Sequence, residues 1–413
     1  MGGFMVKPPL PKNYIYTILL FWCALVVVSA VYIIIPITDS LAAYFQVTEQ
    51  QAAWMSSVFS IFYACGFLLF APLSQKFGKK QIIVFGLLVL ACFTFLTALP
   101  QAFNAVLTFR ALQGLFAATF APTALAYVFE LFPDYWRITV IGYISFGYVL
   151  AGVTGQAVAD HVNQIFDWQS VFYMFAAIYI VTALLFIWLL PKVSNETKKN
   201  VMAEYMRQLQ VISKRKNLLL CYGITFPLLF TFIGMYTILG DYLQAAPYYL
   251  SDEAIYYVRA LGVIGMIFSP LAAKLAGRVK ELTLLRFSLC LSMISLILMG
   301  ISSSLQFIVT MSITYVAGIA CTFPIIMKII GDISGLERSA ASSFYAFVLF
   351  IGASLGSITL VMVEIWGRTG THLFLAGCLA IAFLIALSMK LHGEYKRDGS
   401  FSEILLQQDK HKR

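Results

Sequence analysis

Long apolar stretches with almost no charge constrain this chain more than any other feature of its sequence. About twelve of them follow one another, and most are roughly 18–25 residues long, the length that a helix needs to span a bilayer. A transmembrane β-barrel would instead show alternating segments of about 10 residues. The sequence therefore predicts an all-α membrane protein with twelve transmembrane helices. The stretches are Tyr16–Ile37, Gln51–Ala71, Gln81–Leu99, Phe103–Phe129, Ile138–Ala159, Ser170–Leu190, Leu218–Tyr242, Ala254–Ala272, Leu282–Ile301, Leu305–Met327, Ser339–Val363 and His372–Met389.

The composition supports the same class of protein. Hydrophobic residues make up 61% of the chain and charged residues 11%, whereas a soluble domain carries about 25% charged residues. Because the core of a soluble fold cannot enclose this much apolar surface, we expect the lipid bilayer to surround most of the chain. All seven cysteines fall in the apolar stretches and form no CxxC motif, which favours packing over metal binding or disulfides.

Lysine and arginine indicate the orientation, because the cytoplasmic loops of membrane proteins are enriched in them. If the N-terminus is cytoplasmic, only Arg110, Arg259 and Arg368 of the 28 Lys and Arg residues fall in the outer half. The opposite orientation would put nearly all of them outside. We therefore expect a multi-pass protein of the cell membrane with both termini in the cytoplasm. The net charge of +9 then requires no nucleic-acid partner.

A polar stretch between the sixth and seventh spans divides the chain into two comparable halves. In the linker, Val201, Tyr205, Leu209 and Ile212 recur at helical spacing among basic residues, which predicts a basic amphipathic helix on the inner leaflet. The expected domains are an N-terminal six-helix bundle over residues 1–191, a cytosolic linker over 192–217, a C-terminal six-helix bundle over 218–390 and a cytosolic tail over 391–413.

The two halves resemble copies of one unit. One pair of segments aligns at an offset of 198 positions and three pairs of single residues at 202 positions. Matches near one offset indicate a duplicated six-helix unit, as in transporters whose substrate site lies between the halves near mid-membrane. The aligned pairs are 71–80 with 269–278, Pro122 with Pro324, Glu130 with Asp332, and Asp39 with Asp241.

Several motifs resemble those of the major facilitator superfamily, and the resemblance covers nearly the whole chain. It implies two pseudo-symmetric six-helix bundles, and the span-five motif points to the drug:proton antiporter branch. The motifs are Ala71-Pro-Leu-Ser-Gln75-Lys76-Phe-Gly78-Lys79-Lys80, similar to the loop between spans two and three; Arg110-Ala-Leu-Gln113-Gly114, similar to the arginine motif of span four; Gly147-Tyr-Val-Leu-Ala151-Gly152-Val-Thr-Gly155, similar to the glycine-rich motif of span five; and Trp168-Gln-Ser-Val-Phe172, similar to the start of span six.

The resemblance also implies an inner gate. In relatives the loop after span two acts as a gate clamp and usually has Asp where this chain has Gln75, so a potential ion pair is lost. In span five, Gly152 stands where Pro is usual and Ala151 replaces a Gly. We expect Glu130 with Arg137, and Asp332 with Arg338, to be structural partners at this gate. The expected gating residues are Gln75, Lys76, Gly78, Lys79, Lys80, Glu130, Arg137, Gly147, Gly152, Gly155, Asp332 and Arg338.

Arg110 is the most informative single residue, because a guanidinium stays ionised at any usable pH and this one lies inside an apolar stretch. Insertion scales put the free-energy cost of such a charge at roughly 2.5–3.5 kcal/mol at mid-bilayer. Arg259 is either a second functional charge or a snorkelling surface residue. Asp39 and Asp241, near the outer ends of spans one and seven, either share a structural role or carry a proton. We expect Arg110 to set the pKa of a nearby carboxylate, with Asp39 as the first candidate partner. The candidates for proton coupling are Arg110, Asp39 and Asp241.

Polar side chains within the spans are candidates to line a substrate cavity, although tyrosines also serve in aromatic belts and packed cores. The candidates are Arg110, Gln113, Arg259, Tyr32, Tyr63, Tyr127, Tyr143, Tyr148, Gln156, Tyr236 and Tyr345.

The expected function is secondary active transport by a monomer that uses the proton gradient and no cofactor. The chain has no P-loop motif, no credible catalytic constellation and no filter-like loop, so neither ATP-driven transport, nor an enzyme, nor a channel is indicated. We expect export of a small organic solute by alternating access. Because no Asp or Glu falls in the middle of a span, a neutral, zwitterionic or carboxylate-bearing solute, such as a siderophore-like metabolite, is favoured. The alternatives are a broad-specificity multidrug exporter, an importer of an organic anion, and a non-transporting receptor.

Overall fold

The computed structural model describes residues 11–99, 102–191, 201–269, 279–356 and 358–389. Every regular element in these ranges is a helix, which confirms the all-α prediction. The contacts divide the chain into two units, Met1–Ala203 and Glu204–Arg413. Residues 192–200 of the expected linker and the expected tail over 391–413 lie outside the described residues.

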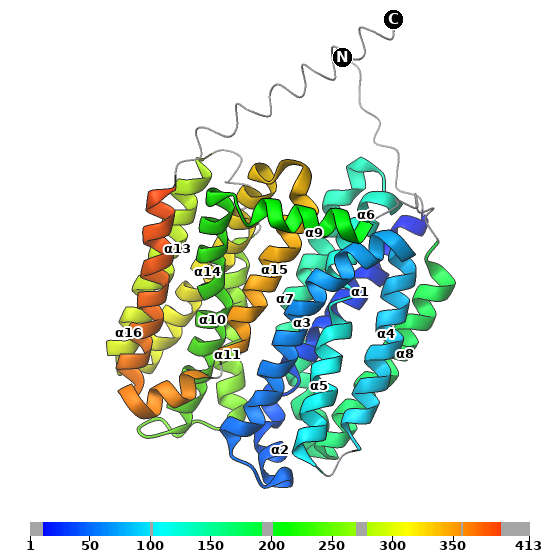
Figure 1. Cartoon of the computed structure of the whole chain (residues 1–413). Coiled ribbons are helices and arrows are strands. Elements are labelled where there is room, and N and C mark those ends of the chain that lie inside the picture. Colours follow the sequence, from blue (N-terminus) through cyan, green and yellow to red (C-terminus); the bar gives the residue numbers. More distant parts are fainter. Residues whose placement is uncertain (1–10, 100–101, 192–200, 270–278, 357, 390–413) are drawn as a thin grey trace, which may run out of the picture. The chain divides into compact units, whose positions relative to one another are not determined.

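The first unit is a bundle of long helices with one short 3-10 helix (Figure 1). Its described elements are α1 (Pro11–Tyr32), η1 (Ile35–Ile37), α2 (Thr38–Phe45), α3 (Glu49–Phe77), α4 (Lys79–Thr97), α5 (Phe103–Ala117), α6 (Ala121–Leu131), α7 (Asp134–Ile165) and α8 (Trp168–Leu189). A further helix, α9 (Val201–Ile212), begins just before the limit between the two units.

The second unit repeats this helical organisation. Its described elements after α9 are α10 (Lys216–Gln244), α11 (Asp252–Met266), α13 (Glu281–Ile301), α14 (Leu305–Ile333), η2 (Gly335–Glu337), α15 (Arg338–Ser354) and α16 (Ile358–Ser388). Gly367, at φ 68° and ψ 174°, interrupts α16. The eleventh and twelfth expected spans therefore meet at this glycine.

Ten helical segments of the described residues are long and apolar enough to cross a membrane. The eighth expected span corresponds to the shorter apolar helix α11, and the eleventh begins with α15, which has 17 residues. The count of twelve spans therefore stays a prediction. The described helices form a multi-pass helical membrane protein.

The boundaries of the helices differ from the prediction at two places. Pro122 lacks an amide hydrogen, and the fourth expected span is broken between Ala117 and Ala121 into α5 and α6. Conversely, the expected loop over 71–80 is mostly helical, because α3 continues through Phe77. Only Gly78, at φ 100°, joins α3 to α4, so the turn is confined to a residue without a β-carbon.

Glycines of the span-five motif allow α7 to approach α1 closely. A β-carbon added to Gly147 would lie 2.8 Å from the carbonyl oxygen of Phe21 and 3.0 Å from the β-carbon of Ala24. One added to Gly155 would lie 2.9 Å from the β-carbon of Ser29. Small residues serve this purpose between membrane helices, where dispersion contacts replace the hydrophobic effect.

We predict that Gly147→Ala lowers the melting temperature of the purified protein in detergent, because the new methyl group overpacks this contact, at a cost of about 1–3 kcal/mol. Gly152→Ala is the matched control on the same helix, since its nearest neighbours would be ring atoms of Tyr32 at 3.8 Å. Alanine is favoured over glycine inside a helix by roughly 0.5–1 kcal/mol. An equal or larger loss for Gly152→Ala would contradict this account of the α1–α7 contact.

Candidate functional site

Arg110 of α5 is fully buried in the first unit, with none of its surface exposed. Its Nε donates to the carbonyl oxygen of Met55 at 3.4 Å, Nη1 to Oε1 of Gln113 at 2.5 Å, and Nη2 to the carbonyl oxygen of Ala30 at 3.1 Å. The guanidinium also stacks on the ring of Phe59, 4.4 Å from its centroid. One side chain of α5 thereby connects α3 and the last turn of α1.

Gln113 extends this network toward α4. Its amide nitrogen donates to the carbonyl oxygen of Phe93 at 3.1 Å and to the hydroxyl of Thr97. Because the amide oxygen accepts from Arg110, the side chain is held at both ends. The arginine and glutamine of the span-four motif thus act as one hydrogen-bonded unit.

No carboxylate contacts Arg110 among the residues that the structure describes. Asp39, the first candidate partner, lies in the first turn of α2 and is exposed. The proposed pairing of Arg110 with Asp39 is therefore not formed in this conformation. The partners that are present are neutral oxygens and an aromatic ring.

One buried tyrosine lies within electrostatic reach of this arginine. Tyr179 of α8 has no exposed surface and lies close enough to Arg110 for their charges to interact. Tyr148 of α7 lies within similar reach of Tyr63, and Tyr63 within reach of Tyr32. The role of Tyr32, Tyr63 and Tyr148 in lining a substrate cavity stays a prediction.

Sequence reasoning missed Tyr179. It lies in a span with several other aromatic residues, and nothing in its local sequence separates it from a core or belt tyrosine. Only the fold, which packs α8 against α4 and α1, brings Tyr179 within electrostatic reach of the arginine.

Three other candidates of the first unit are not part of the hydrogen-bond network of Arg110. The hydroxyl of Tyr127 donates to the carbonyl oxygen of Pro191, just beyond the end of α8. Tyr143 is 49% exposed on α7. The amide of Gln156 donates to the carbonyl oxygen of Gly152, one turn earlier in its own helix, at 2.6 Å. None of these polar groups makes a described contact with Arg110.

In the second unit, Arg259 and Tyr236 contact each other. Nη2 of Arg259 donates to the carbonyl oxygen of Tyr236 at 3.4 Å, and the hydroxyl of Tyr236 donates back to the carbonyl oxygen of Arg259 at 3.5 Å. The guanidinium lies against Gly240, where a β-carbon would collide with it. Arg259 therefore packs against α10, which argues against the snorkelling alternative.

Two candidates of the second unit remain. Asp241 is exposed near the end of α10, within electrostatic reach of Glu364. Tyr345 is buried in α15.

The position equivalent to Arg110 carries no charge in the second unit. Ser312 stands there, and Tyr315 stands at the position equivalent to Gln113. The hydroxyl of Tyr315 donates to Oγ1 of Thr231 at 2.9 Å, so α14 and α10 are joined by neutral groups. Among the described residues, these equivalent helices are joined through a cation in the first unit and through hydroxyl groups in the second.

The expected gate lysines of the first unit bind helix ends. Lys79, at the start of α4, forms an ion pair with Glu130 near the end of α6. Lys80 donates to the carbonyl oxygens of Ile187, at 2.8 Å, and of Leu190 at the end of α8. Such carbonyls lack partners within the helix and attract cations.

This geometry corrects one expected pairing. Glu130 pairs with Lys79, and its described contacts do not include Arg137. Arg137 instead donates to the carbonyl oxygens of Phe129 and Phe132 at the end of α6, at 2.7 and 3.0 Å. The reason is reach: Arg137 follows the turn after α6 and meets the last carbonyls of that helix first.

Two further gate candidates, Gln75 and Lys76, lie in the last turns of α3. The ammonium group of Lys76 lies 5.1 Å from the ring of Phe77.

The second unit has an ion pair and a helix-end contact of the same kinds, and the charge at one equivalent position is reversed. Glu281, at the start of α13, forms an ion pair with Lys328 of α14 at 2.6 Å, and Glu281 is 202 positions after Lys79. Arg286 donates to the carbonyl oxygens of Ala386, Leu387 and Met389 at the end of α16, as Lys80 does at the end of α8.

The expected pair of Asp332 and Arg338 differs in the same way as its first-unit counterpart. Arg338 donates to the carbonyl oxygen of Gly331 in the last turn of α14, at 3.0 Å. Asp332, beside that glycine, is exposed.

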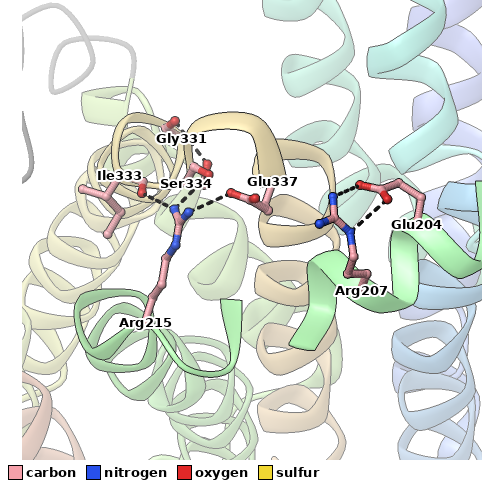
Figure 2. A network of polar contacts seen from close by, with 7 residues as sticks. All are labelled: Glu204, Arg207, Arg215, Gly331, Ile333, Ser334 and Glu337. Atoms are coloured by element: carbon pink, nitrogen blue, oxygen red, sulfur yellow. Dashed lines mark hydrogen bonds and ion pairs between the residues drawn. The ribbon is translucent and has the colours of Figure 1, made fainter. Parts of the chain in front are cut away.

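Arg215 ties the segment before α10 to the end of α14 (Figure 2). It donates to the carbonyl oxygens of Ile333 and Ser334, each at 3.2 Å, and forms an ion pair with Glu337 at 3.0 Å. Sequence reasoning assigned no role to this residue. The same arginine therefore caps one helix and neutralises a carboxylate.

Helix α9 is the amphipathic helix expected in the linker. Val201, Tyr205 and Ile212 are buried along one face, whereas Arg207 pairs with Glu204 on an exposed face at 2.7 Å (Figure 2). The hydrogen bond from Arg207 lowers the pKa of the Glu204 carboxyl. Its location on the inner leaflet stays a prediction.

The described residues contain no group of three or more His, Cys, Asp or Glu side chains that could hold a metal ion.

Several membrane transporters are similar to this chain in sequence. The inner membrane transport protein YnfM of Escherichia coli is 24% identical over 392 residues, which cover 94% of each chain. A bicyclomycin resistance protein homolog of Haemophilus influenzae is 26% identical over 269 residues, 62% of this chain and 65% of that protein. Many further relatives match, and several are described only as uncharacterized transporters.

Among solved structures, the human organic anion transporter MFSD10 (TETRAN) has a TM-score of 0.70 and 15% identity, and the match covers 92% of this chain and all of that one. At this identity the similarity shows the fold alone. The family model described as Major Facilitator Superfamily matches residues 20–357. The protein is therefore a membrane transporter that belongs to the major facilitator superfamily.

Proposed function

We propose that this transporter uses the proton gradient to export a small organic solute, and that the solute is neutral, zwitterionic or carboxylate-bearing. One observation carries the proposal: Arg110 holds a full positive charge inside the first unit without a described carboxylate partner. An unpaired charge in a low-dielectric interior is costly, so a functional reason is expected.

Proton coupling follows from a change of partner. When an arginine approaches a carboxylate, it lowers the pKa of that carboxylate, and when the pair separates the pKa rises again. Arg110 and the exposed Asp39 are apart in this conformation. We propose that they meet in another state of the transport cycle, with Asp241 as the second candidate acid. Uptake of a proton by the released acid would then couple the gradient to alternating access.

The proposed charge of the solute rests on what the spans contain. Because no Asp or Glu lies in the middle of an expected span, a lipophilic cation would find no deep counterion. Arg110 and Arg259 favour a carboxylate instead, and a siderophore-like metabolite would supply one. The name of the human structural neighbour, an organic anion transporter, is compatible with this choice.

The proposed direction rests on the span-five glycines and on one relative. Gly147 and Gly155 lie at the α1–α7 contact, within the motif that resembles drug:proton antiporters. The relative named as a bicyclomycin resistance protein homolog also favours export. That name keeps a broad-specificity multidrug exporter as the second candidate. We place the protein in the cell membrane as a monomer with both termini in the cytoplasm.

Metabolite profiling tests direction and solute together. With active transporter, we predict that the medium contains more of at least one small carboxylate-bearing metabolite, and the cells less, than with the transporter deleted. Arg110→Gln should abolish this difference in metabolite levels. The same difference should persist in cells that express Tyr222→Phe, a variant of the second unit. Accumulation of the metabolite inside the cells would support the importer of an organic anion instead. A deletion strain sensitised only to lipophilic cations would support the multidrug exporter.

The energy source is tested in proteoliposomes with the metabolite so identified. An imposed pH gradient should drive wild-type transport, and Arg110→Lys, which keeps the charge but loses the forked geometry, should reduce the rate at least tenfold. If Arg110→Ala retained the full gradient-driven rate, the proposed coupling role would be wrong.

The gate is tested by exchanging charges. Lys79→Glu and Glu130→Lys should each lower the melting temperature, because each places two like charges together; we expect a cost of about 1 kcal/mol for a pair at this partial exposure. The double variant should recover most of the loss, since it restores an attractive pair of opposite charges with the polarity reversed. Failure of the double variant to recover would show that the contacts around these residues, rather than their attraction, hold the gate.

A further inference from the structure

Gln113 lies between Arg110 and the end of α4, and its amide group has two chemically different ends. The amide oxygen accepts from Nη1 of Arg110 at 2.5 Å. The amide nitrogen donates to the carbonyl oxygen of Phe93 at 3.1 Å and to the hydroxyl of Thr97. If the amide were turned round, its N–H groups would face a guanidinium that can only donate, and the hydrogen bond to the charge would be lost.

Thr97, the last residue of α4, presents only an acceptor to Gln113. Its buried hydroxyl donates its single hydrogen to the carbonyl oxygen of Phe93 at 2.7 Å, so toward Gln113 it can only accept. The carbonyl oxygen of Phe93 is likewise an acceptor. Two acceptors on α4 therefore select the nitrogen end of the amide, and the oxygen end is left for Arg110.

The second unit lacks this arrangement together with the arginine. At the offset of 202 positions, Ser312 corresponds to Arg110 and Met299 to Thr97. Met299 is buried and carries no hydroxyl. The hydroxyl at the end of α4 thus accompanies the buried charge, which favours a role connected with Arg110 over a role in packing alone.

We propose that Thr97 is a positioning residue for transport: its hydroxyl fixes the orientation of the Gln113 amide, and the amide oxygen holds Arg110 in one geometry. A guanidinium held on fixed neutral oxygens can leave for a carboxylate and return to the same place. This role rests on the proposed coupling by Arg110, whereas the hydrogen-bonded relay does not. The described hydrogen bonds of Arg110 do not include Thr97, so the effect of Thr97 passes through Gln113.

Melting temperatures of the purified full-length protein in detergent test the relay without any transported solute. Thr97→Val keeps the shape of the side chain and removes the hydroxyl, and it is combined with Arg110→Lys, which removes the forked geometry. We expect the double variant to lose about 2–4 °C less than the sum of the single variants, because members of one hydrogen-bond network are not additive. Gln113→Met gives a second cycle that leaves Arg110 in place.

Thr94 supplies the matched control, one turn earlier in α4. Its side chain is buried, and its hydroxyl donates to the carbonyl oxygen of Leu90 in the same helix at 2.7 Å. Thr94→Val therefore removes the same atom from the same helix outside the relay. Its losses should add to those of Arg110→Lys and of Gln113→Met. Additive losses for Thr97→Val in both cycles would overturn the inference.

The difference in metabolite levels between medium and cells tests the role in transport. Thr97→Val should reduce this difference about tenfold, the effect of one lost hydrogen bond to a charged group. Thr97→Ser, which keeps the hydroxyl, and Thr94→Val should retain most of it.

Two transport results would overturn the positioning role. One is an equal loss in Thr97→Ser and Thr97→Val, because the shape of the side chain would then matter rather than its hydroxyl. The other is full transport by Thr97→Val while Arg110→Lys is inactive. If the cycles are coupled but no metabolite level depends on the transporter, the relay stands and the proposed function fails.

Discussion

The buried charge of Arg110 is the interaction on which the first unit depends. Its guanidinium holds α5 to α3 and to the last turn of α1, and Gln113 carries the same network to α4. In hydrocarbon such a charge is costly, so every neighbouring oxygen contributes to its solvation. Removing the arginine therefore affects both the packing of four helices and whatever the charge does in transport.

Other arginines in the structure have a different role. Arg137, Arg215, Arg286, Arg338 and Arg368 each donate to carbonyl oxygens at the end of a helix, where a cation is favoured by the helix dipole and by unfilled acceptors. These contacts explain those charges in structural terms. Arg110 bonds one such carbonyl, in α1, but its other partners lie within the bundle, and two of its donors remain. Structure alone therefore accounts for the capping arginines more fully than for Arg110.

The sequence predicts the helices well because apolar length is a local property. The seventh span, expected over Leu218–Tyr242, is α10 over Lys216–Gln244. Contacts between distant segments were harder to predict from the sequence. Glu130 pairs with Lys79 rather than with Arg137, and the sequence did not indicate that Tyr179 lies within electrostatic reach of Arg110. Spacing along one helix gives the face of a side chain, but the partner depends on how separate helices pack. The internal repeat predicts part of these contacts, because Lys79 and Glu281 occupy equivalent positions and both form ion pairs, with opposite charges.

Comparison of the two units shows which contacts are present in both and which charges differ between them. At the start of the equivalent helices α4 and α13, Lys79 and Glu281 each form an ion pair although their charges are opposite and their partners, Glu130 and Lys328, are not equivalent positions. In the interior, the link between equivalent helices is kept while its charge is lost: Arg110 bonds Ala30, whereas Tyr315 bonds Thr231. Because a neutral link suffices in the second unit, packing does not require a cation at this place. This difference supports the proposal that the charge in the first unit serves transport, through an acid of the protein or a carboxylate of the solute.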